Sequence, residues 1–175
     1  MRASLLIVLA PAVLAAGCQY FSGRPGSAIA ELQPTRGHAA QGQVDFLQVG
    51  DRVRVYARVS GLVPGREHAV HVHEVGDCSA PDASSAKGHF NPFGKPHAHY
   101  TALERHAGDL PPLKADARGR GEFDVSLDII SLTGGPALII GRSIVVHANP
   151  DDFRTQPAGN SGARIACGVI RRTPD

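Results

Sequence analysis

The sequence predicts an all-β domain, an antiparallel sandwich or barrel of seven or eight strands. Three observations lead to this prediction. Apolar and polar residues alternate with a period of two in several short segments, turn-forming residues separate those segments, and no convincing amphipathic helix is present. Short strands divided by frequent turns are typical of sandwiches and barrels.

The first two strands are predicted near residues 44–48 and 52–59. Val44 and Phe46 alternate with polar neighbours in the first, and residues 49–52 (VGDR) supply the turn between the two. In the second, one face is apolar and the other is polar. The apolar face holds Val53, Val55, Ala57 and Val59, and the polar face holds Arg52, Arg54, Tyr56 and Arg58.

Three more strands follow along the chain. Residues 122–128 alternate again, with Phe123, Val125 and Leu127 apolar. Residues 144–146 form a short apolar run that suits a buried strand, and residues 165–170 close the domain. Turn residues at 61–65, 117–121 and 133–136 separate the elements.

Histidines are concentrated in one part of the sequence. The chain contains nine, and six of them lie from His71 to His106. His71 and His73 are two residues apart, so on a strand both point to one face, while Val70 and Val72 point to the core. His147 follows the 144–146 strand directly and offers another imidazole.

These histidines and one aspartate are candidate metal ligands. Nitrogen ligands with a single carboxylate suit copper and zinc. The candidates are His71, His73, His89, His97, His106, Asp109 and His147. Seven side chains are too many for one tetrahedral ion, so either some are bystanders or two metals share a ligand. Residues 75–110 show no strand period, and metal binding would order a loop of that length.

The N-terminus resembles an export signal. In residues 1–17, Arg2 precedes an apolar run that is shorter than the roughly 20 residues a bilayer span needs. Residues 14–18 (LAAGC) are similar to a bacterial lipobox, in which cleavage leaves Cys18 as a lipidated first residue. Ordinary cleavage, with Cys18 removed or left free, is the alternative. Residues 18–27 are then a lipidated tether, and residues 28–175 form one domain.

Three cysteines leave an odd one in an exported chain. If Cys18 carries lipid, Cys78 and Cys167 remain as the natural disulfide pair of an oxidising compartment. Two independent buried thiols are the alternative. A formal net charge of +2 with scattered basic residues argues against a nucleic-acid partner.

Five segments together resemble copper/zinc superoxide dismutases of the bacterial exported type. They are residues 71–78 (HVHEVGDC), 88–92 (GHFNP), 105–110 (RHAGDL), 140–147 (IGRSIVVH) and 163–170 (ARIACGVI), in that order. The resemblance covers about residues 28–171. It implies a Greek-key β-sandwich or barrel of about eight strands, with long metal-binding and active-site loops.

The resemblance also implies one copper and one zinc per subunit. The implied copper ligands are His71, His73, His89 and His147. The implied zinc ligands are His89, His97, His106 and Asp109. His89 would therefore bridge the two ions. The neighbouring His99 would be a solvated bystander.

Further site residues follow from the same resemblance. Asp151 would link His71 to His97 and thereby fix both rings. Arg164 and His89 would be catalytic, with the Arg164 guanidinium offering forked donors to a small anion. Steering of that anion would rest on Arg164 and Arg154, and on lysines such as Lys87 and Lys95. His38 and His68 would be surface residues.

The implied activity is dismutation of superoxide to dioxygen and hydrogen peroxide by a redox-cycling copper beside a structural zinc. Such an enzyme would protect the envelope of a Gram-negative bacterium from the periplasmic side, held to the membrane through Cys18. A homodimer stays open. The main alternative is a non-catalytic copper-binding or delivery protein on the same scaffold. A zinc-only structural sandwich and a cupin-like oxygenase are further alternatives.

Overall fold

The computed structural model describes residues 26–174, which form strands and loops almost throughout. The elements are β1 (Ser27–Pro34), β2 (Gln41–Val49), β3 (Arg52–Ser60), β4 (Glu67–His68), β5 (Val70–His73), the 3-10 turn η1 (Ser84–Ala86), β6 (Leu113–Lys114), β7 (Gly121–Leu127), β8 (Ser143–His147), β9 (Arg164–Val169) and β10 (Arg171–Arg172). The all-β prediction is confirmed. Within this part of the chain, no helix has the length and apolarity needed to cross a membrane. The predicted signal peptide and Cys18 lie outside the described residues.

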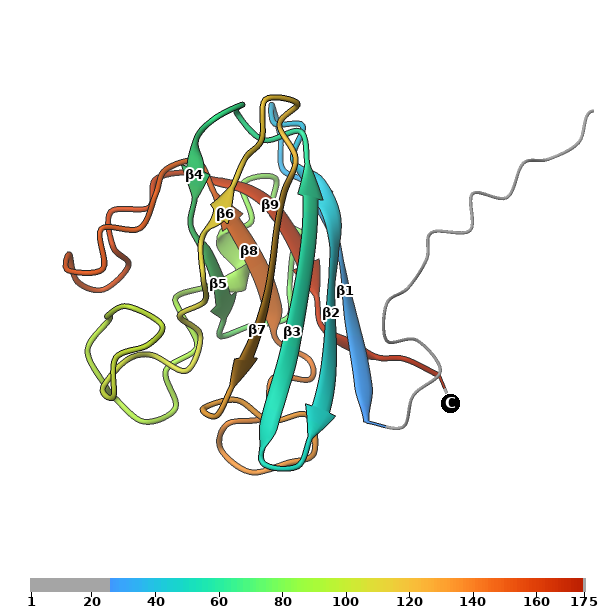
Figure 1. Cartoon of the computed structure of the whole chain (residues 1–175), viewed down its shortest axis with the longest axis vertical. Helices are drawn as coiled ribbons and strands as arrows, with labels where there is room; N and C mark the ends of the chain where they lie inside the picture. The colour runs from blue at the N-terminus through green and yellow to red at the C-terminus, as the bar shows by residue number, and fades with distance from the viewer. Residues whose placement is uncertain (1–25, 175) are drawn as a thin grey trace, which may run out of the picture.

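The strands form one curved antiparallel sheet in the order β5-β8-β9-β1-β2-β3-β7, with β10 beside β1 (Figure 1). β1 joins the two halves of this sheet. Its residues 27–32 pair with β2, whereas Gln33 and Pro34 pair with β9. The sheet therefore folds over at β1 into a sandwich-like half-barrel. β4 and β6 form a separate two-stranded sheet.

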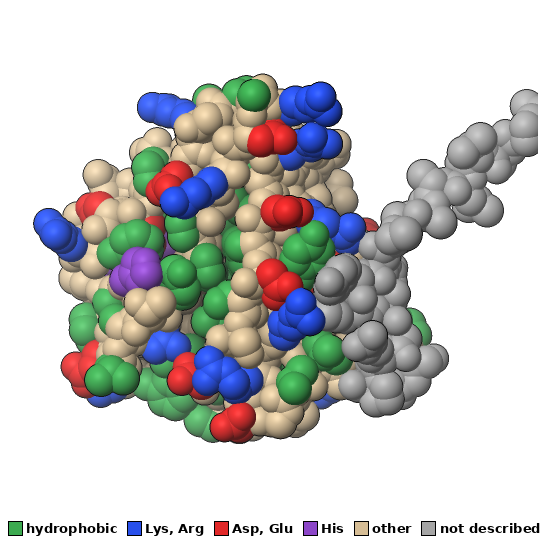
Figure 2. All heavy atoms as spheres, in the orientation of Figure 1, with side chains coloured by type: hydrophobic (Ala, Val, Ile, Leu, Met, Phe, Trp, Pro, Cys, Tyr) green, Lys and Arg blue, Asp and Glu red, His purple; other side chains and the backbone are tan. Residues whose placement is uncertain are grey.

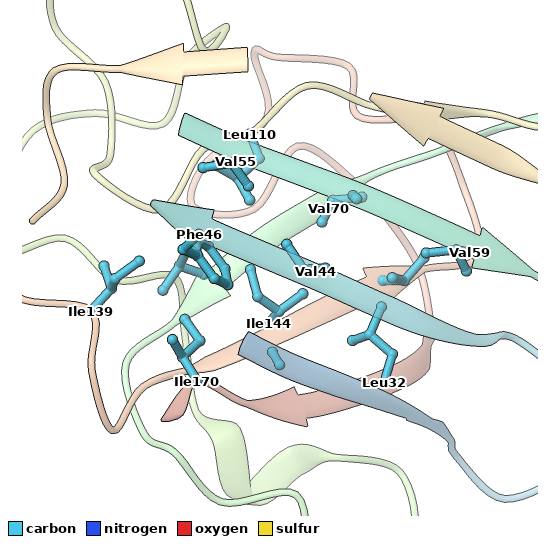
Figure 3. Close-up of a cluster of buried hydrophobic side chains, with 14 of the residues drawn as sticks. Leu32, Val44, Phe46, Val55, Val59, Val70, Leu110, Ile139, Ile144 and Ile170 are labelled. Atoms are coloured by element: carbon cyan, nitrogen blue, oxygen red, sulfur yellow. The ribbon is translucent and has the colours of Figure 1, made fainter. Parts of the chain in front are cut away.

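The core lies between the two halves. Val55 of β3 and Phe46 of β2 face Val70 of β5 and Ile144 of β8, and all four are fully buried or nearly so (Figure 3). Burying one such side chain contributes about 1.5–3 kcal/mol. The alternation predicted for residues 52–59 is confirmed, because the valines and Ala57 are buried and their neighbours are not.

β7 is an edge strand of the sheet, and its predicted apolar face is only partly covered. Phe123 and Val125 are half-buried. On the outer face, Arg54 of β3 forms a two-point ion pair with Asp124 of β7. Acidic and basic side chains are interleaved over this face (Figure 2). Charges on an edge strand discourage pairing with other sheets.

Several strands were not predicted from the sequence. β1 alternates Ala28, Ala30 and Leu32 toward the core, but alanine is a weak strand former, so the segment carries little strand signal. The short strands β4, β6 and β10 are two residues each. The loop prediction for residues 75–110 is confirmed, since η1 is the one regular element within it.

Candidate metal centre

β5 and β8 carry the first three candidate ligands. The two strands pair antiparallel, with His71 opposite Val145 and His73 opposite Ser143. His147 lies at a bulge, where the register between β8 and β9 shifts. A bulge re-aims the side chain that it carries. All three imidazoles are buried, although they point away from the valine core.

The long loop closes the free edge of β5. It forms isolated bridges between His73 and His89 and between His71 and Asp109. At this edge the Val72 N–H donates to the Gly108 carbonyl oxygen, and the Val72 carbonyl oxygen accepts from the Phe90 N–H. Gly108 must be glycine there, because a Cβ would lie 2.3 Å from the Val72 carbonyl oxygen. The loop thus brings its ligands beside those of the strands.

The candidate side chains form two adjoining groups of ligand atoms, with all atoms in each group within 4.8 Å of one another. The first group is His71, His73, His89 and His147. The second is His71, His89, His97 and Asp109. His106 lies beside the second group, its Nδ1 being 3.4 Å from His89 Nδ1 and 3.6 Å from Asp109 Oδ1. The structure therefore brings together all seven candidates.

The donor atoms of the first group fit a metal ion. His73 Nε2 lies 3.4 Å from His147 Nε2, and both rings are buried. His71 Nδ1 and His89 Nε2 are buried with no hydrogen-bond partner among the described residues. Buried nitrogens without partners are costly. An ion that accepts all four lone pairs removes that cost.

The second group has a different chemistry. Asp109 Oδ1 lies 2.9 Å from His97 Nδ1 and 3.3 Å from His89 Nδ1. Asp109 Oδ2 instead accepts hydrogen bonds from the main-chain N–H groups of Ala98 and His106. Three imidazoles and one oriented carboxylate are a donor set that suits zinc.

Asp151 joins the two groups. Its Oδ2 lies 2.7 Å from His71 Nε2, and its Oδ1 lies 2.9 Å from His97 Nε2. The Phe153 N–H donates to Oδ1 at 2.7 Å and orients the carboxylate. A carboxylate on the outer nitrogen of a ligand histidine fixes its tautomer and ring orientation. Both rings therefore present Nδ1 to the ligand groups.

Arg164 lies at the mouth of the first group. Its guanidinium donates to the main-chain carbonyls of Ala83 and Lys87, each at 2.6 Å. Lys87 O also lies 2.9 Å from His73 Nδ1. Arg164, His73, His89 and His147 line a cavity of about 490 Å³. The two carbonyl anchors of Arg164 were not predicted from the sequence.

The protonation of the site follows from burial and from the two carboxylates. Burial lowers the pKa of His71 to about 4, despite its hydrogen bond to Asp151. Burial and the neighbouring His147 lower the pKa of His73 to about 2. At His97 burial opposes protonation, but hydrogen bonds to Asp109 and Asp151 outweigh it and raise the pKa to about 9. The rings of His71 and His73 are therefore neutral near pH 7, which is the form that binds metal.

The metal-free protein should therefore lose stability steeply as the pH falls from 6.5 to about 4. In this window the unfolded chain protonates His71 at its ordinary pKa of 6.5, whereas the folded chain does so near 4. His71 alone should remove about 3 kcal/mol. His97 acts oppositely, since its stabilisation is complete below pH 6.5 and is lost as the pH rises through about 9. Denaturant titrations of metal-free protein across this window measure the effect, and a constant midpoint would contradict it.

The remaining histidines differ in their environments. His38 is exposed, as predicted. His99 packs against Tyr100 and Phe153 and stays partly exposed, with its Nδ1 2.8 Å from Thr101 Oγ1 at the surface. The surface prediction for His68 is wrong, because His68 is fully buried and its Nδ1 lies 2.9 Å from the His147 carbonyl oxygen. His68 ends β4, two residues before β5 begins. Its polar neighbours in the sequence did not indicate that folding would bury it.

Cys78 and Cys167 form a disulfide, which confirms the predicted pair. Their Cα atoms are 5.8 Å apart and the cysteines are separated by 89 residues in sequence. Cys167 lies on β9, three residues after Arg164. Cys78 begins the loop segment that holds the Ala83 and Lys87 carbonyls. The disulfide therefore holds the loop segment that carries the Ala83 and Lys87 carbonyls against β9, the strand that carries Arg164.

A β-sandwich with two adjoining groups of histidine and aspartate ligands that share the rings of His71 and His89 has the features of a binuclear metalloprotein. The family model described as Copper/zinc superoxide dismutase (SODC) matches residues 40–170. The chain belongs to the copper/zinc superoxide dismutase family, whose cofactors are copper and zinc.

Known relatives agree with this assignment. The Cu-Zn superoxide dismutase 2 of Aquifex aeolicus (strain VF5) is 40% identical over 146 residues, which cover 81% of this chain and 85% of the relative. The Cu-Zn superoxide dismutase of Caulobacter vibrioides is 42% identical over 136 residues, covering 74% and 78%. The crystal structure of the clock protein EA4 is similar with a TM-score of 0.76 at 39% identity, covering 85% of this chain and 95% of that one.

Proposed function

We propose that this protein dismutates superoxide to dioxygen and hydrogen peroxide. The observation that carries the proposal is the pair of adjoining ligand groups beside a cavity that Arg164 lines. A copper store would need the first group alone. The cavity, the second group and a guanidinium at the mouth are additional features that a reaction on a small anion requires.

The donor atoms support a division of the ligands between the two metals. We assign copper to His71, His73, His89 and His147. We assign zinc to His89, His97, His106 and Asp109. We place His71 in the first group, because its Nε2 is taken by Asp151 and its Nδ1 has no hydrogen-bond partner among the described residues. His89 can bind on both sides, since Nε2 has no partner and Nδ1 faces Asp109.

Bound copper supplies the one-electron redox chemistry, and zinc, which has no accessible redox state, orders the ligands. The protein's own residues bind and orient the substrate. Arg164 remains charged, although burial lowers its pKa, and its guanidinium attracts a monovalent anion into the cavity. His89 also lines the cavity, so its Nε2, whenever it is not bound to metal, would hold a proton for the product.

Charge around the cavity should steer the anion. Lys95 forms an ion pair with Glu104 at 2.7 Å, which reduces its contribution to steering. Lys87 and Arg154 are exposed. We expect Arg164→Ala to slow turnover about tenfold and to flatten its dependence on salt concentration, since a screened charge near the substrate is lost. Turnover at several ionic strengths measures this, and a slope equal to that of the wild type would contradict it.

Direct measurement of superoxide decay after pulse generation tests the proposed activity. The soluble domain, loaded with copper and zinc, is compared with its zinc-only form. Copper-dependent decay near the diffusional range supports the enzyme. Decay no faster than in the zinc-only form, with copper shown to be bound, would replace the enzyme with a copper-handling protein.

We further propose that the chain is exported and anchored in the cell envelope through a lipid on Cys18. The lipobox-like residues 14–18 and the Cys78–Cys167 disulfide, which needs an oxidising compartment, support this. Labelled fatty acid should be incorporated into the wild type but not into Cys18→Ser. Sedimentation equilibrium of the soluble domain decides between a monomer and a homodimer, which the sequence leaves open.

A further inference from the structure

Gln156 makes two hydrogen bonds to the main chain of His97, which lies 59 residues earlier. The His97 N–H donates to Gln156 Oε1 at 2.8 Å, and Gln156 Nε2 donates to the His97 carbonyl oxygen at 2.8 Å. His97 lies outside any strand, and within residues 26–174 neither group has a main-chain partner. One side-chain amide therefore replaces a strand neighbour for this residue.

The same loop contacts the His97 ring from another side. Asp151 Oδ1 lies 2.9 Å from His97 Nε2. Gly159 packs over this hydrogen bond so closely that a Cβ would lie 1.8 Å from Asp151 Oδ1 and 2.7 Å from His97 Nε2. Residues 151–159 thus surround His97 through its ring and its peptide groups. This segment and the loop of residues 75–110 project on the same side of the sheet (Figure 1).

The residues after Gln156 form the wall of the cavity. Pro157 and Ala158 line it together with His89 and His147. Their position follows from that of Gln156, whose amide is fixed by His97. His97 in turn lies 2.9 Å from Asp109 in the second ligand group. A continuous series of contacts therefore leads from the second ligand group to the entrance of the first.

We propose that Gln156 is a positioning residue that couples the zinc ligand His97 to the wall of the substrate cavity. The proposal rests on the proposed function in taking His97 as a zinc ligand and the cavity as the path of a small anion. Loss of the amide frees the His97 peptide groups and the Pro157–Ala158 wall together. Zinc retention and anion access then change in the same variant.

Three variants separate this role from general packing. Gln156→Ala removes both hydrogen bonds to His97, together with the longer one from Gln156 Nε2 to the Arg154 carbonyl oxygen. Gln156→Glu keeps the shape and one acceptor but removes the donor, and it places a carboxylate against the His97 carbonyl. Gln41→Ala makes the same change at an exposed glutamine on β2 and is the matched control. Circular dichroism verifies that each variant is folded, as expected for exposed positions.

Two readouts are needed, and neither depends on turnover. The first is the rate of zinc transfer to a chelator from protein loaded with both metals. The second is the affinity for azide, a small linear anion, followed through the copper absorption. We expect both Gln156 variants to release zinc about tenfold faster than the wild type and to change azide affinity about threefold, because two hydrogen bonds to His97 are lost or opposed. Gln41→Ala should match the wild type.

The proposal is overturned if zinc release from both Gln156 variants stays within about twofold of the wild type. It is also overturned if zinc release accelerates while azide affinity is unchanged, since the wall would then be independent of His97. If Gln156→Glu released zinc at the wild-type rate while Gln156→Ala released it fast, the shape of the side chain, and not the hydrogen bond that its amide donates to His97, would be what matters. An inactive protein that still shows both expected effects would refute the proposed activity and leave the role of Gln156 intact.

Discussion

Replacing Asp151 with alanine is expected to weaken zinc binding by about 10- to 100-fold, the usual effect of removing a carboxylate that orients ligand histidines. Asp151 bonds to the ring of His71, a ligand of the first group, and to the ring of His97, a ligand of the second. Without it, the Nε2 atoms of His71 and His97 lose their acceptor inside the protein. Both rings can then rotate or change tautomer, so Nδ1 no longer faces the metal reliably.

Competition with a chromophoric chelator measures the zinc affinity of this variant. Asp152→Ala is the matched control, because Asp152 is the adjacent carboxylate but bonds to Thr155 and Arg154 within its own loop. The control should bind zinc as the wild type does. Equal losses in the two variants would mean that loop folding, and not the bridge between His71 and His97, sets the affinity.

Removing the Cys78–Cys167 disulfide is expected to lower the free energy of unfolding by about 4–5 kcal/mol. The bond closes a loop of 89 residues, and in the chain-entropy model a loop of this size restricts the unfolded state by that amount. A stability of about 5–15 kcal/mol is usual for a domain, so the loss is a large share. The anchors of Arg164 should also loosen, because Ala83 and Lys87 follow Cys78 in the loop.

The double variant Cys78→Ala/Cys167→Ala, compared with the oxidised wild type in denaturant titrations, gives this difference. Reduced wild-type protein is the control, and it should unfold at nearly the same denaturant concentration as the double variant. A loss below about 1 kcal/mol would show that the unfolded chain is already restricted without the bond.

The sequence determined the class of fold and the chemistry of the site. Alternation in residues 52–59 predicted the face of β3 that is buried, because a period of two assigns each residue to one side of a strand. The spacing of His71 and His73 predicted a shared face for the same reason. The identity of the seven candidate ligands also came from the sequence, since few side chains bind copper or zinc.

Tertiary structure alone decided how these residues meet. β1 gave little local signal, yet it joins the two halves of the sheet through long-range pairing. His68 is buried by elements distant in sequence, and Gln156 reaches His97 across 59 residues. The local pattern of apolar and polar residues indicates which secondary structure a segment prefers and which of its faces is exposed to water. It does not show which distant segment packs against it. The contacts of His71 with Asp151, of His73 with Lys87 and of His97 with Gln156 are all of that kind.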